Sequence, residues 1–326
     1  MHVLITGAAG MIGRKLTARL VEDGALAGRP LETLTLVDVV PPEAPAGFAG
    51  RAHLVVADLS VPGEAARVVA GRPGTIFHLA AIVSGEAETD FDKGYRINLD
   101  GTRALLDAVR TIGGGYRPRL VFTSSIAVFG APFPEAIGDE FHLTPLTSYG
   151  TQKAICELLL ADYTRRSCVD GIAIRLPTIS VRPGKPNRAA SGFFSSIIRE
   201  PLAGAEAVLP VDEGVRHWHA SPRAAVGFLL HAAQLPAERL GSRIALTMPG
   251  VCCTVGEQIA ALTRVAGEGV AGRIRREPDP MIMRIVAGWP SRFDARRAVA
   301  LGFQAESSFD DIVRVHVEDE LGGHVY

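Results

Sequence analysis

Short apolar runs and amphipathic segments alternate along the first half of the chain. The apolar runs have the length of strands, and the segments between them carry apolar residues three or four positions apart, which is typical of helices. Strands are predicted at 2–6, 33–37, 52–57, 75–79, 119–124 and 171–176, and helices at about 12–23, 64–71, 93–112 and 148–166. Apolar strands separated by amphipathic helices predict a parallel sheet covered by helices on both faces.

The pattern becomes less regular after Arg175, where Pro177, Pro183 and Pro186 interrupt it. We therefore expect an α/β fold with a Rossmann-type doubly wound parallel sheet in residues 1–176. A smaller C-terminal lobe, mainly residues 177–326, is expected to bind the substrate. A strand–helix unit near 215–234, and the segment 290–303 with a short helix after Asp294, are expected to return to the first domain.

The first strand passes directly into a glycine-rich turn, which a helical pattern follows at once. Strand, glycine turn and helix form the context that a dinucleotide-binding loop requires. Gly7 allows a tight turn, Gly10 lets the backbone approach a pyrophosphate, and Gly13 lets the helix pack against the sheet. The first helical residues, Met11 and Ile12, bring backbone N–H groups to the anion. The alternative is a glycine-rich turn without a ligand.

An acidic residue, Asp38, ends the second strand, 25 residues after Gly13. A carboxylate at this point accepts hydrogen bonds from the adenosine ribose and repels a 2′-phosphate. Together with the glycine turn, it predicts that the chain binds NAD in preference to NADP.

Tyr149 and Lys153 stand four residues apart on a predicted helix, and Ser125 follows an apolar strand. Positions i and i+4 share one helix face, so the Lys153 ammonium can stabilise a Tyr149 phenolate. A free phenol has a pKa of about 10 and needs such help to act as a base. With Ser125 holding a substrate hydroxyl, the three residues form a group that takes a proton from an alcohol. An ordinary surface pair is the alternative reading of Tyr149 and Lys153.

Several candidate residues follow directly after predicted strands: Gly7, Asp38, Asp58, Ala80 and Ser125. In parallel sheets, ligands bind beyond the carboxyl ends of the strands. The sequence therefore predicts that the cofactor loop and the proposed base lie along one edge of the sheet.

Composition and charge exclude some partners. The 326-residue chain has a formal net charge of −1, a pI of about 6.8 and no basic run, so neither nucleic acid nor an anionic membrane is expected as a partner. Its four cysteines suggest no metal site and no disulfide framework, and the adjacent Cys252 and Cys253 are read as structural, with reactivity as the alternative. A strand that begins at residue 2 leaves no room for a signal peptide, and no apolar run reaches membrane-helix length. We expect a soluble, cytoplasmic protein.

Ordered motifs covering nearly the whole chain resemble the extended short-chain dehydrogenase/reductase superfamily, which includes the NAD-dependent epimerase/dehydratase family. They are Thr6-Gly-x-x-Gly-x-x-Gly13, Asp58-Leu59, His78-Leu79-Ala80-Ala81, Asn98-x-Asp-Gly-Thr102, Thr123-Ser124-Ser125-x-x-Val128-Phe129-Gly130, Tyr149-x-x-x-Lys153, Phe293-Asp294-Ala295-Arg296 and Leu301-Gly302-Phe303.

The resemblance implies a role for each matching residue. Tyr149 is the general base, Lys153 binds the nicotinamide ribose and lowers the tyrosine pKa, and Ser125 positions the substrate hydroxyl. Further residues implied to contact or support the cofactor are Asp58 and Leu59 near the adenine, Leu79, Ala80 and Ala81 along the cofactor, Asn98 beneath the proton path, and Pro177 and Ile179 near the nicotinamide.

The sequence departs from the nucleotide-sugar enzymes of this superfamily at two places. These carry Arg-x-x-Asn after the last core strand, where this chain has Arg175-Leu-Pro-Thr178. Their later Arg-Asp-Phe segment appears here as Arg216-His217-Trp218-His219, without the acidic residue. These strings, with residues 83–88, 141–149 and 181–187, more closely resemble the D-erythronate dehydrogenases, a branch that oxidises C2 of a four-carbon sugar acid with NAD.

A 2-hydroxy acid needs a cationic partner for its carboxylate. Arg182, Lys185, Arg188 and Arg216 are the candidates. Arg216 is the first choice, because related enzymes use an arginine there on substrate phosphate. The alternative for the other three is a solvated loop charge. Ser84 and Thr178 are further predicted substrate contacts, with helix capping or a turn as the alternative for Ser84.

Three further expectations complete the analysis. His217 and His219 flank Trp218 and are expected to point the same way as walls of a pocket; no third ligand has suitable spacing for zinc, and no metal is expected. The helices at 93–112 and 148–166 form a dimerising bundle in many relatives, which implies a homodimer. Rival functions are a nucleotide-sugar epimerase or dehydratase and a non-catalytic NAD-sensing regulator, although the latter usually loses the tyrosine or lysine that this chain retains.

Overall fold

The computed structural model describes residues 1–184 and 191–325, which divide into two compact units. Unit 1 comprises residues 1–128, 147–175 and 226–246, and unit 2 comprises 129–146, 176–225 and 247–326. The predicted residues Lys185 and Arg188 lie outside the described part of the chain. The assignment of residues 177–326 to a substrate lobe, with returns to the first domain, stays a prediction, because compact packing does not assign a ligand to either unit.

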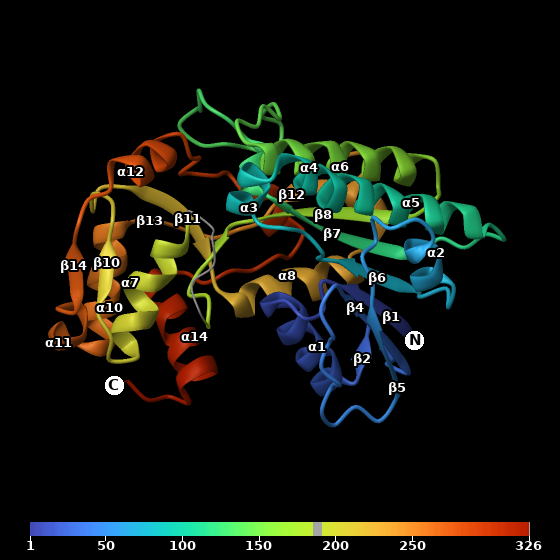
Figure 1. Cartoon of the computed structure of the whole chain (residues 1–326), viewed down its shortest axis with the longest axis horizontal. Coiled ribbons are helices and arrows are strands. Elements are labelled where there is room, and N and C mark those ends of the chain that lie inside the picture. The colour runs from blue at the N-terminus through green and yellow to red at the C-terminus, as the bar shows by residue number, and fades with distance from the viewer. Residues whose placement is uncertain (185–190, 326) are drawn as a thin grey trace. The chain divides into compact units, whose positions relative to one another are not determined.

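A seven-stranded sheet forms the centre of unit 1 (Figure 1), and its strand order is β12-β8-β7-β6-β1-β4-β5. Its strands are β1 (His2–Thr6), β4 (Thr33–Asp38), β5 (Arg51–Val56), β6 (Thr75–His78), β7 (Arg119–Ser125), β8 (Asp170–Leu176) and β12 (Ala245–Thr247). The pairs β1–β4, β4–β5, β1–β6 and β6–β7 are parallel. This arrangement confirms the predicted doubly wound α/β sheet, because the order runs outward from β1 in both directions.

Helices cover both faces of this sheet. In Figure 1, α5 and α6 lie over one face, and α1 and α8 lie over the other. The helical elements assigned to this part of the chain are α1 (Met11–Asp23), α2 (Glu64–Val69), α3 (Ser84–Thr89), α4 (Phe91–Gly94), α5 (Gly101–Ile112), the 3-10 turn Ile126–Val128, α6 (Ser148–Arg165), α8 (Pro222–Gln234) and α9 (Ala237–Leu240). A short hairpin joins β2 (Ala25–Leu26) to β3 (Arg29–Pro30).

The sheet core is apolar on both faces, as the unbroken apolar strands predict. Phe77 and Phe122 on the central strands, with Leu4 and Ile5 on β1, are among the largest fully buried side chains. Leu105 and Leu160 bring α5 and α6 into the same cluster. Burial of these rings and branched chains against the helices supplies the main favourable term for folding.

The segment predicted as a single helix at 93–112 contains a π-helical turn. Residues Tyr95–Asp100 form this turn between α4 and α5. Asn98 lies in the turn and is buried. Its Oδ1 accepts from the Ile82 N–H at 2.9 Å, and its Nδ2 donates to Gln152 Oε1 at 2.7 Å. These bonds accompany the π-helical turn between α4 and α5: the Asn98 side-chain amide in this turn holds the loop after β6. Such turns recur at functional sites.

Unit 2 has its own small sheets and its own apolar core. Its strands are β9 (Thr178–Ile179), β10 (Ala207–Leu209), β11 (Arg216–Ala220), β13 (Val251–Thr254) and β14 (Ile274–Arg276), which pair as β13-β11-β9 and β10-β14. Its helices are α7 (Gly192–Leu202), α10 (Val255–Ala266), α11 (Glu268–Ala271), α12 (Pro280–Ala287), α13 (Arg296–Ala300) and α14 (Phe309–Leu321).

The strand β11 with α8, and the short helix α13, occur where the sequence predicts them. Unit 2 also contains helices that the sequence analysis did not predict, among them α7, α10 and α14. Among the described residues, none of the helices combines the length and the apolar character needed to cross a membrane.

Candidate active site

The glycine turn after β1 is closely packed. Gly7 has φ +74°, and a Cβ built on it lies 2.8 Å from the backbone N of Ala80. A Cβ on Gly13 clashes with the carbonyl oxygen of Gly7. Because any side chain at these two positions collides with backbone, the sequence requires glycine there. The turn thereby brings the first residues of α1, Met11 and Ile12, close to the end of β1.

A cavity of about 350 Å³ opens above this turn. Four strand ends contribute to its walls: β1, β4, β5 and β6. The lining residues are Thr6, Gly7, Ala9, Gly10, Val37, Asp38, Val39, Val40, Ala57, Asp58, Leu59, His78, Leu79, Ala80, Ala81, Ile82 and Ile97. The structure therefore brings together eight of the sixteen residues predicted to bind the cofactor, at the switch point of the sheet.

Asp38 faces the glycine turn from the end of β4. Its Oδ2 accepts from the Ala9 N–H at 2.9 Å, and its Oδ1 accepts from the Val39 N–H at 2.7 Å. These backbone bonds fix the carboxylate at the cavity wall. A fixed carboxylate beside a glycine turn is the arrangement that a ribose diol requires.

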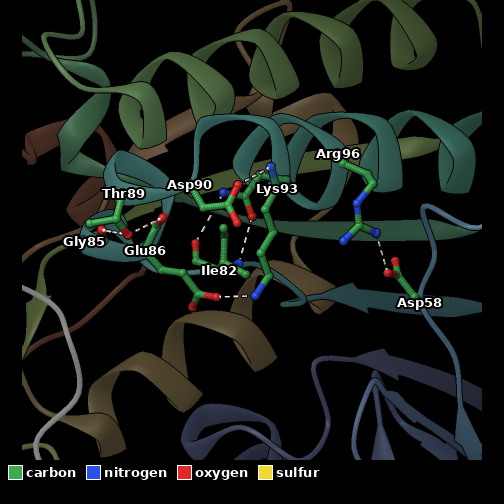
Figure 2. A network of polar contacts seen from close by, with 9 residues as sticks. Asp58, Ile82, Gly85, Glu86, Thr89, Asp90, Lys93 and Arg96 are labelled. Atoms are coloured by element: carbon green, nitrogen blue, oxygen red, sulfur yellow. Dashed lines mark hydrogen bonds and ion pairs between the residues drawn. The ribbon is translucent and has the colours of Figure 1, made fainter.

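Asp58 is held by a neighbouring pair that sequence reasoning did not single out. Figure 2 shows Arg96 reaching Asp58, with its Nη1 2.7 Å from Asp58 Oδ2. Oδ1 accepts from the N–H and hydroxyl of Ser60. Burial alone raises the pKa of Asp58, but the Ser60 hydrogen bonds and the Arg96 charge outweigh it, so the pKa is lowered. Asp58 is therefore an anion at the cavity wall.

His78 forms a buried link between β1 and α5 behind the same cavity. Its Nδ1 shares a hydrogen bond of 2.7 Å with Thr6 Oγ1, and its Nε2 shares one of 2.9 Å with Thr102 Oγ1. Burial, with the Lys153 charge, lowers the pKa of His78 to about 3, so the ring is neutral at physiological pH. His78 belongs to the quoted His-Leu-Ala-Ala motif, but the sequence does not show this supporting role.

The loop after β6 leads into α3, which begins at Ser84. Val83 holds the N-cap position, so Ser84 does not cap this helix. Figure 2 shows Lys93 reaching back to Glu86 of α3, with Nζ 2.6 Å from Oε1. Glu88 of α3 accepts a hydrogen bond of 2.5 Å from the Ser148 N–H, at the start of α6. The loop, α3 and the N-terminus of α6 are therefore linked directly.

The predicted base and its neighbours lie together in unit 1. Ser125, at the end of β7, lies close enough to Tyr149 for its hydroxyl to lower the pKa of the phenol through hydrogen bonding. Lys153 lies one turn further along α6, with Nζ 5.7 Å from the centre of the Tyr149 ring. This ammonium is buried and donates to the Thr123 carbonyl at 2.8 Å. Thr147 caps α6 by accepting from the Gly150 N–H, which fixes the helix start beside Tyr149.

Burial affects the two titrating side chains in opposite directions. It raises the pKa of Tyr149 to about 12, while the Ser125 hydrogen bond acts to lower it. It lowers the pKa of Lys153 to about 8, against the influence of Cys156 and Glu157. Each shift reflects the cost of a lone buried charge. A phenolate beside an ammonium avoids part of that cost, because the two charges compensate each other.

The other predicted contacts lie in unit 2. Pro177 is buried, and Thr178 and Ile179 form the short strand β9. Thr178 Oγ1 shares a hydrogen bond of 2.7 Å with His217 Nε2. The Arg182 guanidinium donates to Ser191 Oγ at 3.1 Å. Arg216 is exposed, with Nη1 3.6 Å from Glu257.

His217 and His219 point the same way, as predicted, with ring centres 5.4 Å apart. Both are buried, and His217 stacks on Phe194 at 5.0 Å. Burial lowers the pKa of His217 to about 4 and that of His219 well below its usual value. The two rings are therefore neutral and packed in the unit 2 interior.

The residues around the cavity fit NAD. Gly7, Ala9 and Gly10 of the glycine turn line the cavity, and α1 begins directly after this turn, so its N-terminal N–H groups are available to a pyrophosphate. Asp38 and Asp58 supply acceptors for ribose and adenine. The fold and these residues define the class: an NAD-binding enzyme with a Rossmann-type sheet.

Comparison with known proteins agrees. A model of the NAD dependent epimerase/dehydratase family matches residues 3–232. D-erythronate dehydrogenase from Cupriavidus necator is 49% identical over 98% of this chain and 98% of its own length. D-erythronate dehydrogenase from Haemophilus influenzae is 43% identical over 98% of this chain and 100% of its own. The crystal structure of a protein titled nucleoside-diphosphate-sugar epimerase, from Agrobacterium tumefaciens, is 67% identical and has a TM-score of 0.98, covering 100% of this chain and 96% of its own.

The chain therefore belongs to the NAD dependent epimerase/dehydratase family. The predicted family, the cofactor NAD and the class of NAD-dependent oxidoreductase are confirmed.

Replacement of Asp38 tests the cofactor site. Asp38→Ser combined with Val39→Arg removes the ribose acceptor and adds a cation for a 2′-phosphate, and Val39 is exposed enough to accept the larger side chain. We expect the ratio of kcat/KM with NAD to that with NADP to fall by about 10²-fold or more, equivalent to about 3 kcal/mol. Val39→Arg alone is the control and should shift the ratio less. Equal use of both cofactors by the unaltered protein would show that Asp38 does not face the ribose.

Proposed function

We propose that the protein oxidises the C2 hydroxyl of a small sugar acid with NAD, with D-erythronate as substrate and 2-oxo-erythronate as product. The observation that carries this proposal is the placement of Ser125 and Tyr149 beside the buried Lys153, at the edge of the sheet that holds the cofactor cavity. The two curated relatives named D-erythronate dehydrogenase support the choice of substrate.

The chemistry follows from the three side chains. Ser125 holds the substrate hydroxyl, and the Tyr149 phenolate accepts its proton. Lys153 stabilises that phenolate and holds the nicotinamide ribose. NAD, when bound, accepts the hydride from C2. The C2–H electron pair leaves as hydride while the O–H electrons form the carbonyl, so one oxidation yields a ketone, NADH and a proton.

The substrate carboxylate needs a cation, and we assign that role to Arg182 ahead of Arg216. Arg216 is exposed and already lies near Glu257. Arg182 is half-buried, and burial and the neighbouring Arg199 charge lower its pKa. Among the described residues, no carboxylate forms an ion pair with Arg182. A half-buried guanidinium without a carboxylate partner is stabilised by a bound anion, to which it donates two parallel hydrogen bonds. Ser84 and Thr178 remain proposed contacts for substrate hydroxyls.

A nucleotide-sugar epimerase is the second candidate, because the similar Agrobacterium protein bears that title. Two features favour the sugar acid. Thr178 stands where nucleotide-sugar enzymes are expected to carry Asn, and its hydroxyl is engaged by His217. His217 itself replaces an expected acidic residue and is buried against Phe194. The homodimer expected from the α4–α5 and α6 helices, and the cytoplasmic location, stay predictions.

Tyr149→Phe tests the base. Removal of the hydroxyl should lower kcat by about 10²–10⁴-fold, the usual contribution of a positioned base. The NAD dissociation constant should change little. Tyr163→Phe is a matched control on the same helix, since that hydroxyl donates to Asp107 away from Ser125. Retention of more than about a tenth of the activity in Tyr149→Phe would assign the base to another group.

Lys153→Met tests the stabilisation of the phenolate. Since the reaction needs deprotonated Tyr149, kcat/KM should rise with pH, and the bound cofactor and Lys153 should bring its midpoint below the value of about 12 that burial gives the phenol. Loss of the ammonium removes a positive charge, so the midpoint should move to higher pH and NAD should bind more weakly. Lys93→Met is the control, because its ammonium pairs with Glu86. A midpoint unmoved by Lys153→Met contradicts the assigned role.

A substrate panel tests the class of ligand. NAD reduction is measured with four- to six-carbon aldonates, the matching neutral polyols, and UDP- and dTDP-sugars. D-erythronate should be preferred, and its neutral polyol should be a poor substrate. Arg182→Met should lower kcat/KM for D-erythronate by about 10–10²-fold, since a hydrogen bond to a charged group contributes about 1.5–3 kcal/mol. Arg216→Met should lower it less.

Conversion of a UDP-sugar with no reaction of D-erythronate would replace this proposal with the epimerase. A larger loss in Arg216→Met than in Arg182→Met would return the carboxylate to Arg216. In both variants the NAD dissociation constant reports whether the effect is confined to substrate.

A further inference from the structure

A buried polar group that the proposed chemistry does not use lies behind Lys153. Glu157 on α6 is 3% exposed, and Arg175 on β8 is 4% exposed. Arg175 Nη2 lies 2.7 Å from Glu157 Oε2, and Arg175 Nε lies 3.0 Å from Oε1. The Ser124 hydroxyl also donates to Glu157 Oε1 at 2.5 Å. The carboxylate is therefore buried, paired with an arginine and held from two strands.

This group continues the row of reacting side chains. Tyr149, Lys153 and Glu157 are spaced by four residues, so they share one face of α6. Three consecutive residues at the end of β7 each lie beside one of them. Ser125 lies beside Tyr149, the Thr123 carbonyl accepts from Lys153, and the Ser124 hydroxyl donates to Glu157. The end of β7 thus contacts all three side chains of this row.

We propose that Glu157 is a positioning residue that keeps Lys153 charged and in place, with Arg175 and Ser124 holding the carboxylate. The inference rests on the proposed role of Lys153 in binding the cofactor and stabilising the phenolate. Glu157 itself touches neither substrate nor cofactor in this account and acts through Lys153.

The charges around Lys153 support this role. Its titratable neighbours on α6 are Tyr149, Cys156 and Glu157, and the facing groups are His78 on β6 and Arg175 on β8. Phe122 on β7 lies below it, with Nζ 4.7 Å from the ring centre. Burial lowers the pKa of Lys153, while Cys156 and Glu157 raise it. The Glu157 carboxylate, paired with Arg175 one helical turn beyond Lys153, is a negative group that acts against the effect of burial.

Packing alone does not require charges here. Replacing a buried ion pair with apolar residues of similar volume is often neutral or stabilising. A carboxylate one turn from a buried ammonium has an electrostatic effect that an apolar pair lacks. The predicted consequence is therefore a change in the titration of Lys153, distinct from a change in stability.

The experiment measures the pKa of Lys153 directly in the full chain. The protein is labelled with carbon-13 at lysine Cε and titrated by NMR, which is feasible because the chain has four lysines: Lys15, Lys93, Lys153 and Lys185. Absence of one signal in Lys153→Met assigns it. We expect a pKa near 8 in the unaltered protein. Glu157→Gln should lower it by about one pH unit, as loss of a nearby opposite charge does.

The kinetic consequence follows from the sign of this shift. With a lower pKa, Lys153 loses its charge at lower pH and stabilises the phenolate less. The midpoint of the rise in kcat/KM should therefore move to higher pH, as in Lys153→Met but by less. As pH rises, NAD affinity should begin to fall at a lower pH in the variant than in the unaltered protein. A purely structural role would lower activity equally at every pH.

Asp170→Asn is the matched control. Arg119 and Asp170 form an ion pair of 2.9 Å between the starts of the same strands, β7 and β8, away from Lys153. This variant should leave the pKa of Lys153 unchanged. If Glu157→Gln fails to fold, the double variant Glu157→Gln/Arg175→Met is used, because it removes both buried charges together. The pKa of Lys153 should again fall, since Glu157 is the member of the pair that acts on Lys153.

An unchanged pKa of Lys153 in the folded Glu157 variant, or an equal shift in Asp170→Asn, overturns the proposal. The NMR titration needs no substrate, so it stands even if D-erythronate proves inert. Failure of the proposed reaction and failure of this inference are therefore distinguishable.

Discussion

The arrangement of the site depends on the burial of the Lys153 ammonium between α6 and β7. This ammonium donates to the Thr123 carbonyl at 2.8 Å. A lone charge inside a protein is costly, and here several features of the fold offset that cost. The carbonyl, the Phe122 ring and the Glu157 carboxylate surround the ammonium with negative potential. The same position places the ammonium one helical turn from Tyr149, where a positive charge favours the phenolate.

The cofactor cavity rests on a different constraint, the close approach of backbone to backbone. A side chain at Gly7 would collide with the backbone at Ala80, and one at Gly13 would collide with the backbone of the turn itself. Asp38 is fixed beside this turn by the N–H groups of Ala9 and Val39. The cofactor cavity and Ser125 lie along one edge of the sheet because the strands concerned run in one direction.

The names of similar proteins point to two reactions, a sugar-acid dehydrogenase and a nucleotide-sugar epimerase. The NAD-binding cavity of unit 1 is common to the family and does not by itself distinguish the two. The difference lies in what the substrate carries beyond its reacting carbon. In unit 2, His217 and His219 are buried and neutral, so Arg182 is the partly buried positive charge among these residues.

The sequence by itself determined the central sheet, the glycine turn and the identities of Ser125, Tyr149 and Lys153. Their signals are local: apolar runs of strand length, glycines at fixed offsets, and residues four apart on a helix. The π-helical turn that carries Asn98 was not visible, because its hydrogen bonds to Ile82 and Gln152 join distant segments.

Only the tertiary structure showed that Arg96 pairs with Asp58, that Glu88 meets the start of α6, and that Arg175 and Ser124 hold Glu157. The small sheets of unit 2 were equally hidden, since short strands such as β9 and β10 carry too few residues to show a period. The tertiary structure also decided which arginine side chains are exposed to solvent. Whether an arginine is solvated, like Arg216, or enclosed, like Arg182, depends on which distant segments cover it, and sequence periodicity records only the local chain.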